Sequence, residues 1–121
     1  MATILIVEDE ALLLTLVESV LQDAGYETIS AATVNDAQTI IVNLRRRVDL
    51  IFTDIGLPDH PDGGVTIGRL VAQFRPDTPV LYTSGRRPAE EIRYPPVKRS
   101  GFLHKPYKNE DLIQAVAVFF C

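Results

Sequence analysis

Short apolar runs alternate with longer stretches of helical periodicity along this chain, and that alternation limits the possible folds more than any other feature. The first run, Ile4–Val7, is continuous and rich in β-branched residues, which is typical of a strand covered on both faces of a parallel sheet. From about residue 10 to residue 24 apolar side chains recur at helical spacing, and Gly25 supplies a stop. The sequence therefore opens with a strand followed by a helix.

The same alternation continues to the end of the chain. Further strands are predicted at residues 26–31, 49–53, 79–83 and 101–104. Further helices are predicted at residues 33–47, 65–74 and 109–119. Thr33 and Asn109 are the expected N-caps, and Arg45–Arg47 are expected to close the second helix, where cations are favoured. Five strands separated by helices predict an α/β fold, a doubly wound parallel sheet between two helical layers.

Residues 86–99 are the least regular part of the sequence. A helix that starts at Pro88 must end before Pro95–Pro96, so the fourth helix is predicted to be short or irregular. The segment is also locally basic, with five cations at Arg86, Arg87, Arg93, Lys98 and Arg99. Two interpretations stay open for it: a degraded loop, and a docking surface for an acidic partner.

Length and composition predict one domain spanning residues 1–121. Hydrophobic residues make up 46% and charged residues 23%, a balance that argues against disorder. The net charge of −4 predicts no direct contact with nucleic acid. The single cysteine, Cys121, excludes an internal disulfide framework. No apolar run is long enough for a membrane span and no signal peptide is recognisable, so we expect a cytoplasmic protein.

Polar and charged side chains follow the predicted strands at the ends where parallel strands meet. These residues are Glu8, Asp9 and Glu10 after the first strand, Asp54 after the third, Thr83 and Ser84 at the fourth, and Lys105 after the fifth. Ligands of open α/β sheets bind at this carboxyl edge. We therefore expect a cluster of acids, a hydroxyl and a lysine to lie close together.

Each of these residues alone is ordinarily a turn or capping residue. Their combination is harder to explain by stability, because two carboxylates at ~5 Å and an effective dielectric constant of ~20 repel by roughly 3 kcal/mol. A divalent cation removes that cost, and hard oxygen ligands suit Mg²⁺. The sequence therefore predicts a magnesium site, with the lysine balancing the charge of a further anion.

The chain resembles the receiver domains of two-component response regulators over essentially its whole length. Four segments carry the resemblance: residues 4–10, residues 49–58 around Asp54, residues 79–85, and residues 101–107 with Lys105 followed by Pro106. The resemblance implies a flavodoxin-like, CheY-like fold with strand order 2-1-3-4-5. It also implies a cis peptide bond before Pro106.

The resemblance further implies a function and a role for each site residue. Asp54 would accept a phosphoryl group from a histidine kinase or a histidine phosphotransfer protein. Asp9, Asp54, Glu8 and the backbone carbonyl of Gly56 would hold Mg²⁺, with Glu8 acting mainly through water. Lys105 would pair with phosphoryl oxygens, Ser84 would be the switch hydroxyl in preference to Thr83, and Phe102 would be the aromatic switch.

The sequence departs from the family pattern at two of these positions. Gly56 stands where a larger side chain is usual, which predicts a more open site, and Ser84 replaces the more frequent threonine.

Other functions remain open. One is a pseudo-receiver that binds partners without phosphorylation. Another is an enzyme, although a nucleotide site would want a glycine-rich turn after the first strand. Surplus apolar residues on the first and last helices also leave a homodimer open.

Overall fold

Five parallel strands form one sheet in the computed structural model, which describes residues 1–56, 63–85 and 99–120. The strands are β1 (Thr3–Val7), β2 (Glu27–Ala31), β3 (Leu50–Asp54), β4 (Val80–Ser84) and β5 (Ser100–His104). Their order across the sheet is β2-β1-β3-β4-β5. The predicted fold class and strand order are both confirmed.

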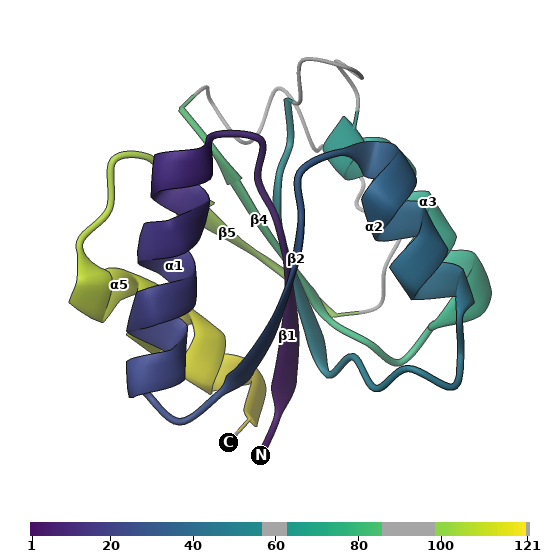
Figure 1. Ribbon diagram of the computed structural model, residues 1–121, viewed down its shortest axis with the longest axis horizontal. Coiled ribbons are helices and arrows are strands. Elements are labelled where there is room, and N and C mark those ends of the chain that lie inside the picture. Colours follow the sequence, from purple (N-terminus) through teal and green to yellow (C-terminus); the bar gives the residue numbers. More distant parts are fainter. Residues whose placement is uncertain (57–62, 86–98, 121) are drawn as a thin grey trace.

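Helices cover both faces of this sheet (Figure 1). They are α1 (Ala11–Asp23), α2 (Val34–Val42), α3 (Gly63–Phe74) and α5 (Asn109–Ala117), with a final 3₁₀ turn η1 (Val118–Phe120). In Figure 1, α1 and α5 lie on one side of the sheet and α2 and α3 on the other. The predicted fourth helix falls within residues 86–98, outside the described residues, and is therefore not tested.

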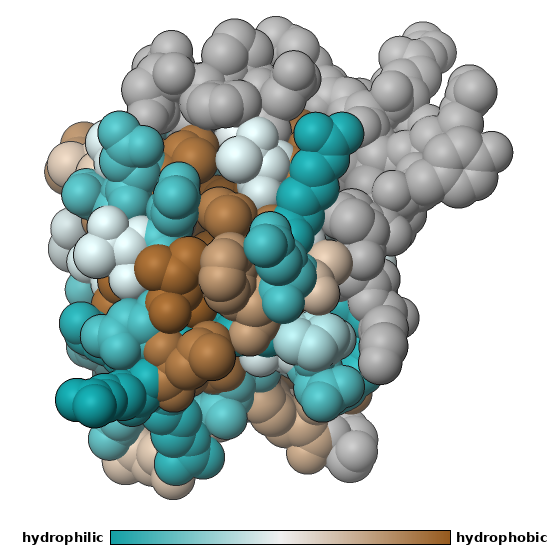
Figure 2. Space-filling view, turned by 90° about the vertical axis from the view of Figure 1, so that its right-hand side faces the viewer, coloured by the Kyte–Doolittle hydropathy of each residue, from teal (hydrophilic) through white to brown (hydrophobic). Residues whose placement is uncertain are grey.

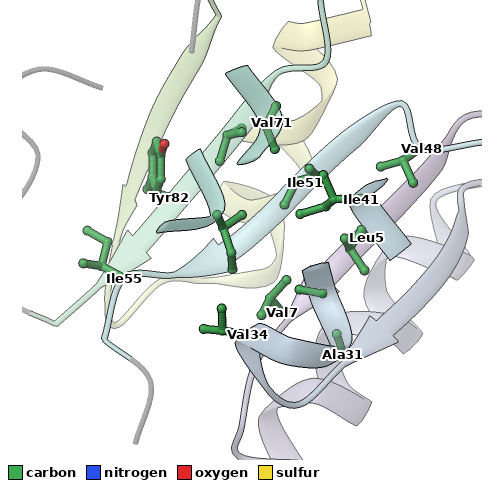
Figure 3. Close-up of a cluster of buried hydrophobic side chains, with 13 residues drawn as sticks. Leu5, Val7, Ala31, Val34, Ile41, Val48, Ile51, Ile55, Val71 and Tyr82 are labelled. Carbon is green, nitrogen blue, oxygen red and sulfur yellow. The ribbon is translucent and has the colours of Figure 1, made fainter. Parts of the chain in front are cut away.

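Strand alternation divides the buried side chains into two hydrophobic clusters, one on each face. Along β1, Ile4 and Ile6 belong to the cluster under α1 and α5, whereas Leu5 and Val7 belong to the cluster under α2 and α3. Figure 3 shows Leu5 and Val7 in the second cluster with side chains of α2 and neighbouring strands. A strand buried on both faces explains why the sequence is apolar at every position of the run.

The outer surface of α2 and α3 carries both hydrophobic and hydrophilic residues. Figure 2 views this side, where hydrophobic residues form a band bordered by hydrophilic ones. Val42, at the end of α2, and Leu44, just beyond it, are among the exposed apolar residues.

Within the described residues, no helix has both the length and the apolar character needed to cross a membrane.

Two helix ends follow the predicted capping chemistry. After α1, Gly25 has a φ of 99° and its N–H donates to the Gln22 carbonyl, while the Tyr26 N–H donates to Leu21. This pattern is a Schellman motif, which needs a residue with positive φ. At α2, the Thr33 hydroxyl accepts a 3.1 Å hydrogen bond from the Asp36 N–H, which confirms Thr33 as the N-cap.

Two other capping predictions were wrong. The last helix begins one residue earlier than expected, because Lys108 is its N-cap and Asn109 is its first residue. The Lys108 N–H donates to the Asp111 carboxylate at 3.1 Å, so the reciprocal contact comes from the third helical residue. Helix α2 ends at Val42, and Arg45–Arg47 lie beyond its last turn.

A different arginine satisfies the end of α2. Arg75, which follows α3, donates to the carbonyls of Ile41 at 2.8 Å, Asn43 at 2.7 Å and Arg46 at 2.7 Å. One guanidinium carries several donors in a fixed planar arrangement, so it can serve carbonyls that no helical N–H reaches. The cation expected at this helix end is present, but it comes from the neighbouring helix.

Candidate functional site

Side-chain alternation places three of the predicted site residues on one face of the sheet. Glu8 continues the β1 positions that pack under α1 and α5, and Asp54 continues Phe52 of that same cluster on β3. Lys105 continues Leu103 beyond β5. The expected meeting of residues from three strand ends is therefore found.

Lys105 is the centre of this group. Its Nζ lies 2.7 Å from Asp54 Oδ2 and 3.3 Å from Glu8 Oε1. The side chain of Glu8 is 6% exposed, that of Asp54 13% and that of Lys105 25%. The peptide bond between Lys105 and Pro106 is cis, as expected. The ammonium is thus held between two largely buried carboxylates at the rim of the sheet.

Burial and neighbouring charges act in opposite directions on these groups. Burial is the largest influence on Glu8 and raises the pKa of its carboxyl group, although the Glu10 N–H and the Lys105 charge lower it. For Lys105, burial disfavours the ammonium, but the hydrogen bond and charge of Asp54, helped by Glu8, raise its pKa above the ordinary value. The folded site therefore favours the charged form of Lys105 and disfavours the ionised form of Glu8.

The acidic residues also fit a divalent cation. One carboxylate oxygen from each of Glu8, Asp9 and Asp54 lies within 4.8 Å of the other two. Asp9 is exposed, so a cation could keep water ligands on that side. Hard oxygen donors with retained waters are what Mg²⁺ prefers. The donor set therefore fits the predicted metal. One Lys105 ammonium cannot neutralise the negative charge of three carboxylates, so a cation would also be favoured by charge.

The two neighbouring hydroxyls at the end of β4 have different surroundings. Ser84 is 5% exposed and is the register partner of His104 on β5. Thr83 is 2% exposed, and its Oγ1 donates to the Leu103 carbonyl at 2.7 Å. The hydroxyl of Thr83 is therefore committed to the backbone of β5, which sequence reasoning did not reveal.

Phe102 and Gly56 have different surroundings. Phe102 is half-buried against the cluster under α2 and α3, with its ring centroid 6.3 Å from that of His104. The Gly56 N–H donates to Asp54 Oδ1 at 3.3 Å. A Cβ atom built on Gly56 would meet nothing within 4 Å, which agrees with the open site expected from the missing side chain.

An apolar hollow adjoins the charged group and was not predicted. Its volume is about 230 Å³, and its walls come from α1 and from the segment between Lys105 and Leu112. Leu16 on its wall is 50% exposed, and Leu12 in the preceding turn of α1 is 83% exposed. The surplus leucines of the first helix were visible in the sequence, but the hollow depends on the distant segment that faces them.

The fold and the charged rim together define a CheY-like α/β domain with an acidic, lysine-containing site at the carboxyl edge of its sheet. Residues 4–117 match the family model of the response regulator receiver domain. The chain therefore belongs to the response regulator receiver domain family, whose members are signalling modules of two-component systems.

Known proteins and solved structures support this membership. The chain is 34% identical over 113 residues to the nitrogen assimilation regulatory protein NtrX of Azorhizobium caulinodans, covering 91% of this chain and 24% of that protein. A response regulator receiver protein from Sinorhizobium medicae superposes with a TM-score of 0.86 at 32% identity, over 98% of this chain and 93% of that one. The chemotaxis regulator CheY4 of Vibrio cholerae gives 0.84 at 28% identity, with 98% of both chains covered.

The chain spans only a fraction of the longer proteins it matches. It corresponds to 24% of NtrX and to 12% of the sensor kinase CckA of Brucella abortus, to which it is 31% identical over 95% of its own length. These relatives carry the same module within larger proteins. The likeness therefore concerns the receiver domain itself.

Proposed function

We propose that this domain accepts a phosphoryl group on Asp54 and changes its surface in response. The observation that carries the proposal is the 2.7 Å contact of Lys105 Nζ with Asp54 Oδ2 beside the acidic cluster. A carboxylate that serves as a nucleophile needs a cation to offset the charge of an incoming phosphoryl group. The donor would be a histidine kinase or a histidine phosphotransfer protein.

The proposed transfer is a displacement at phosphorus. An Asp54 oxygen forms the new bond to phosphorus while the bond from phosphorus to the donor nitrogen breaks, and its electron pair stays with the donor imidazole. Lys105 is placed to meet the charge on the transferred oxygens, and the work of the site is mainly positioning and charge neutralisation. The product is an acyl phosphate on Asp54.

Glu8, Asp9 and Asp54 would hold Mg²⁺ in this proposal, with the backbone carbonyl of Gly56 as a further ligand. When bound, the cation would screen the carboxylates from the incoming phosphoryl group and stabilise its charged oxygens. Burial that raises the pKa of Glu8 makes the cluster responsive to such a cation, because Mg²⁺ favours the ionised carboxylate.

The response would run through Ser84 and Phe102. A new anion on Asp54 would draw the Ser84 hydroxyl and the Lys105 ammonium toward it, and Phe102 would repack in the space vacated. The half-buried position of Phe102 supports this role, since its ring is neither fully buried nor fully exposed. One local charge event would thereby bias a two-state surface.

The apolar hollow beside Lys105 supports docking of the donor protein there. A helix seated between α1 and the segment after β5 would cover Leu12 and Leu16 and would bring a histidine on its flank toward Asp54. The relative CckA is named as a sensor kinase, and a solved structure is titled as the receiver domain of the hybrid histidine kinase CckA, which is consistent with a kinase-type partner.

Incubation with acetyl phosphate and Mg²⁺, followed by intact mass spectrometry, tests the proposal. The wild-type chain should gain one phosphoryl group, and chelation of Mg²⁺ should abolish the gain. Asp54→Asn should gain none, whereas Asp23→Asn, an exposed acid at the end of α1, should behave as the wild type. Absence of labelling in the wild type would instead favour the pseudo-receiver alternative.

A further inference from the structure

Thr83 occupies the position between the two residues that form the central charged contact. It is the register partner of Asp54 on β3 and of Leu103 on β5, two residues before Lys105. Leu81 packs in the cluster under α1 and α5, so alternation places Thr83 on that same face, which Asp54 also shares. Thr83 is therefore a buried neighbour of the site on the correct side of the sheet.

The hydroxyl of Thr83 is bound to the strand that carries the lysine. Its Oγ1 donates to the Leu103 carbonyl at 2.7 Å, a short hydrogen bond in a region where Thr83 is 2% exposed. A second bond lies one residue further along, where the Lys105 N–H donates to the Ser84 carbonyl at 3.0 Å. These two bonds join the end of β4 to the backbone immediately before the Lys105 side chain.

The position of Lys105 depends on this attachment. Strand β5 ends at His104, and Lys105 makes the last backbone bond to β4. Pro106, which follows Lys105, has no N–H to donate to a strand ladder. The side-chain hydrogen bond on the Leu103 carbonyl therefore adds to the Lys105 N–H bond in holding the end of β5 against β4. Lys105 Nζ lies 2.7 Å from Asp54 Oδ2, so a shift of this strand end would alter the central charged contact.

We propose that Thr83 is a positioning residue for phosphoryl transfer, its hydroxyl fixing the strand end that aims Lys105 at Asp54. The inference rests on the proposed phosphoacceptor function of Asp54 and assigns Thr83 a role separate from the switch hydroxyl of Ser84. Thr83 touches neither the donor nor the transferred group and acts through Lys105.

Thr83→Val and Thr83→Ser test this role. Valine keeps the shape but removes the donor, and serine keeps the donor but removes a methyl group. Thr83→Val should slow labelling by acetyl phosphate about fivefold, the effect of losing one ordinary hydrogen bond, and Thr83→Ser should restore most of the rate. Both variants are compared at a temperature where circular dichroism shows them fully folded.

Heteronuclear NMR of the Lys105 ammonium, at one pH and without phosphodonor, supplies a readout that does not depend on transfer. The ammonium signal should be sharp in the wild type and in Thr83→Ser, and broadened by faster proton exchange in Thr83→Val. An unchanged Lys105 signal in folded Thr83→Val overturns the inference. If the three proteins show the expected signal pattern but the wild type is never labelled, the phosphoacceptor function fails while the positioning of Lys105 by Thr83 stands.

Discussion

Glu8 shows how the fold keeps a carboxylate where burial opposes its charge. Its two oxygens accept hydrogen bonds from the Glu10 N–H at 3.1 Å and from Lys105 Nζ at 3.3 Å. These bonds lower the free energy of the ionised form, yet burial dominates and the pKa is raised. A residue placed for stability alone would be apolar here, as the preceding residues Ile4–Val7 are, so the acid points to a ligand with positive charge.

The raised pKa of Glu8 gives a pH dependence of stability with a definite sign. In the unfolded chain this carboxyl group has its ordinary pKa of 4.5, whereas the folded chain holds the proton to higher pH. Unfolding therefore releases a proton in that window, and the contribution of Glu8 is lost as pH rises through its folded pKa. In the absence of Mg²⁺, Glu8→Gln should gain stability relative to the wild type as pH rises from 4 to 7.

Urea unfolding at a series of pH values measures this difference between the two proteins. A constant difference across the window would contradict the assignment of the raised pKa to Glu8. Glu18→Gln, a substitution on α1 remote from the sheet edge, serves as the control and should show no comparable trend.

At the scale of elements, the two ends of α2 differ in how well the sequence predicts them. Local patterns identified Thr33 and Gly25, because the relevant contacts lie within five residues of each other. Arg75 could not be found in this way, since the carbonyls it binds lie 29 to 35 residues away in sequence. The alternating pattern likewise predicted which strand ends meet, but not that Thr83 rather than water would bind the Leu103 carbonyl.

Arg75→Ala should destabilise the domain by about 2 kcal/mol, the range of hydrogen bonds made by a charged group. Several carbonyls at the end of α2 would lose their donor, and the contact between α2 and α3 would loosen. Chemical denaturation measures the change. Arg69→Ala, which removes an exposed arginine within α3, should change stability by no more than about 0.5 kcal/mol. Equal effects of both substitutions would contradict the capping role.

Helix α1 carries the docking prediction. Leu16→Glu should weaken phosphoryl transfer from a cognate histidine-containing donor about tenfold or more, because it places a charge on the wall of the apolar hollow. The same variant should be labelled normally by acetyl phosphate, which needs no docking surface. Leu44→Glu is the matched control, since Leu44 is 63% exposed just beyond α2. Equal loss with both variants would argue against docking at α1.

At the scale of the whole molecule, the net charge of −4 conceals an uneven distribution. Three carboxylates gather at one edge of the sheet with one lysine among them. Two-sided burial of the strands holds that edge rigidly, because each central strand is packed between helices on both faces. Sequence patterns predicted this architecture well, since parallel strands and their connecting helices have strong periodic signals.

Mg²⁺ should stabilise the folded domain by binding the acidic cluster only when the chain is folded. At a concentration one hundred times its dissociation constant, the gain is about 2.7 kcal/mol. Differential scanning calorimetry with and without MgCl₂ measures the shift in the unfolding midpoint. Asp9→Asn should remove most of the shift, and KCl at matched ionic strength should not reproduce it. An equal shift in Asp9→Asn would contradict the proposed metal site.

The central claim is that Asp54 carries the phosphoryl group. Treatment of the chain with acetyl phosphate and Mg²⁺, followed by borohydride reduction and peptide mass spectrometry, tests it most directly. Borohydride supplies the electrons that reduce an aspartyl phosphate to homoserine with loss of phosphate, so the modified position is recorded permanently. We predict homoserine at position 54 and at no other aspartate. Homoserine at another position, or none while phosphoryl transfer proceeds, would contradict the account.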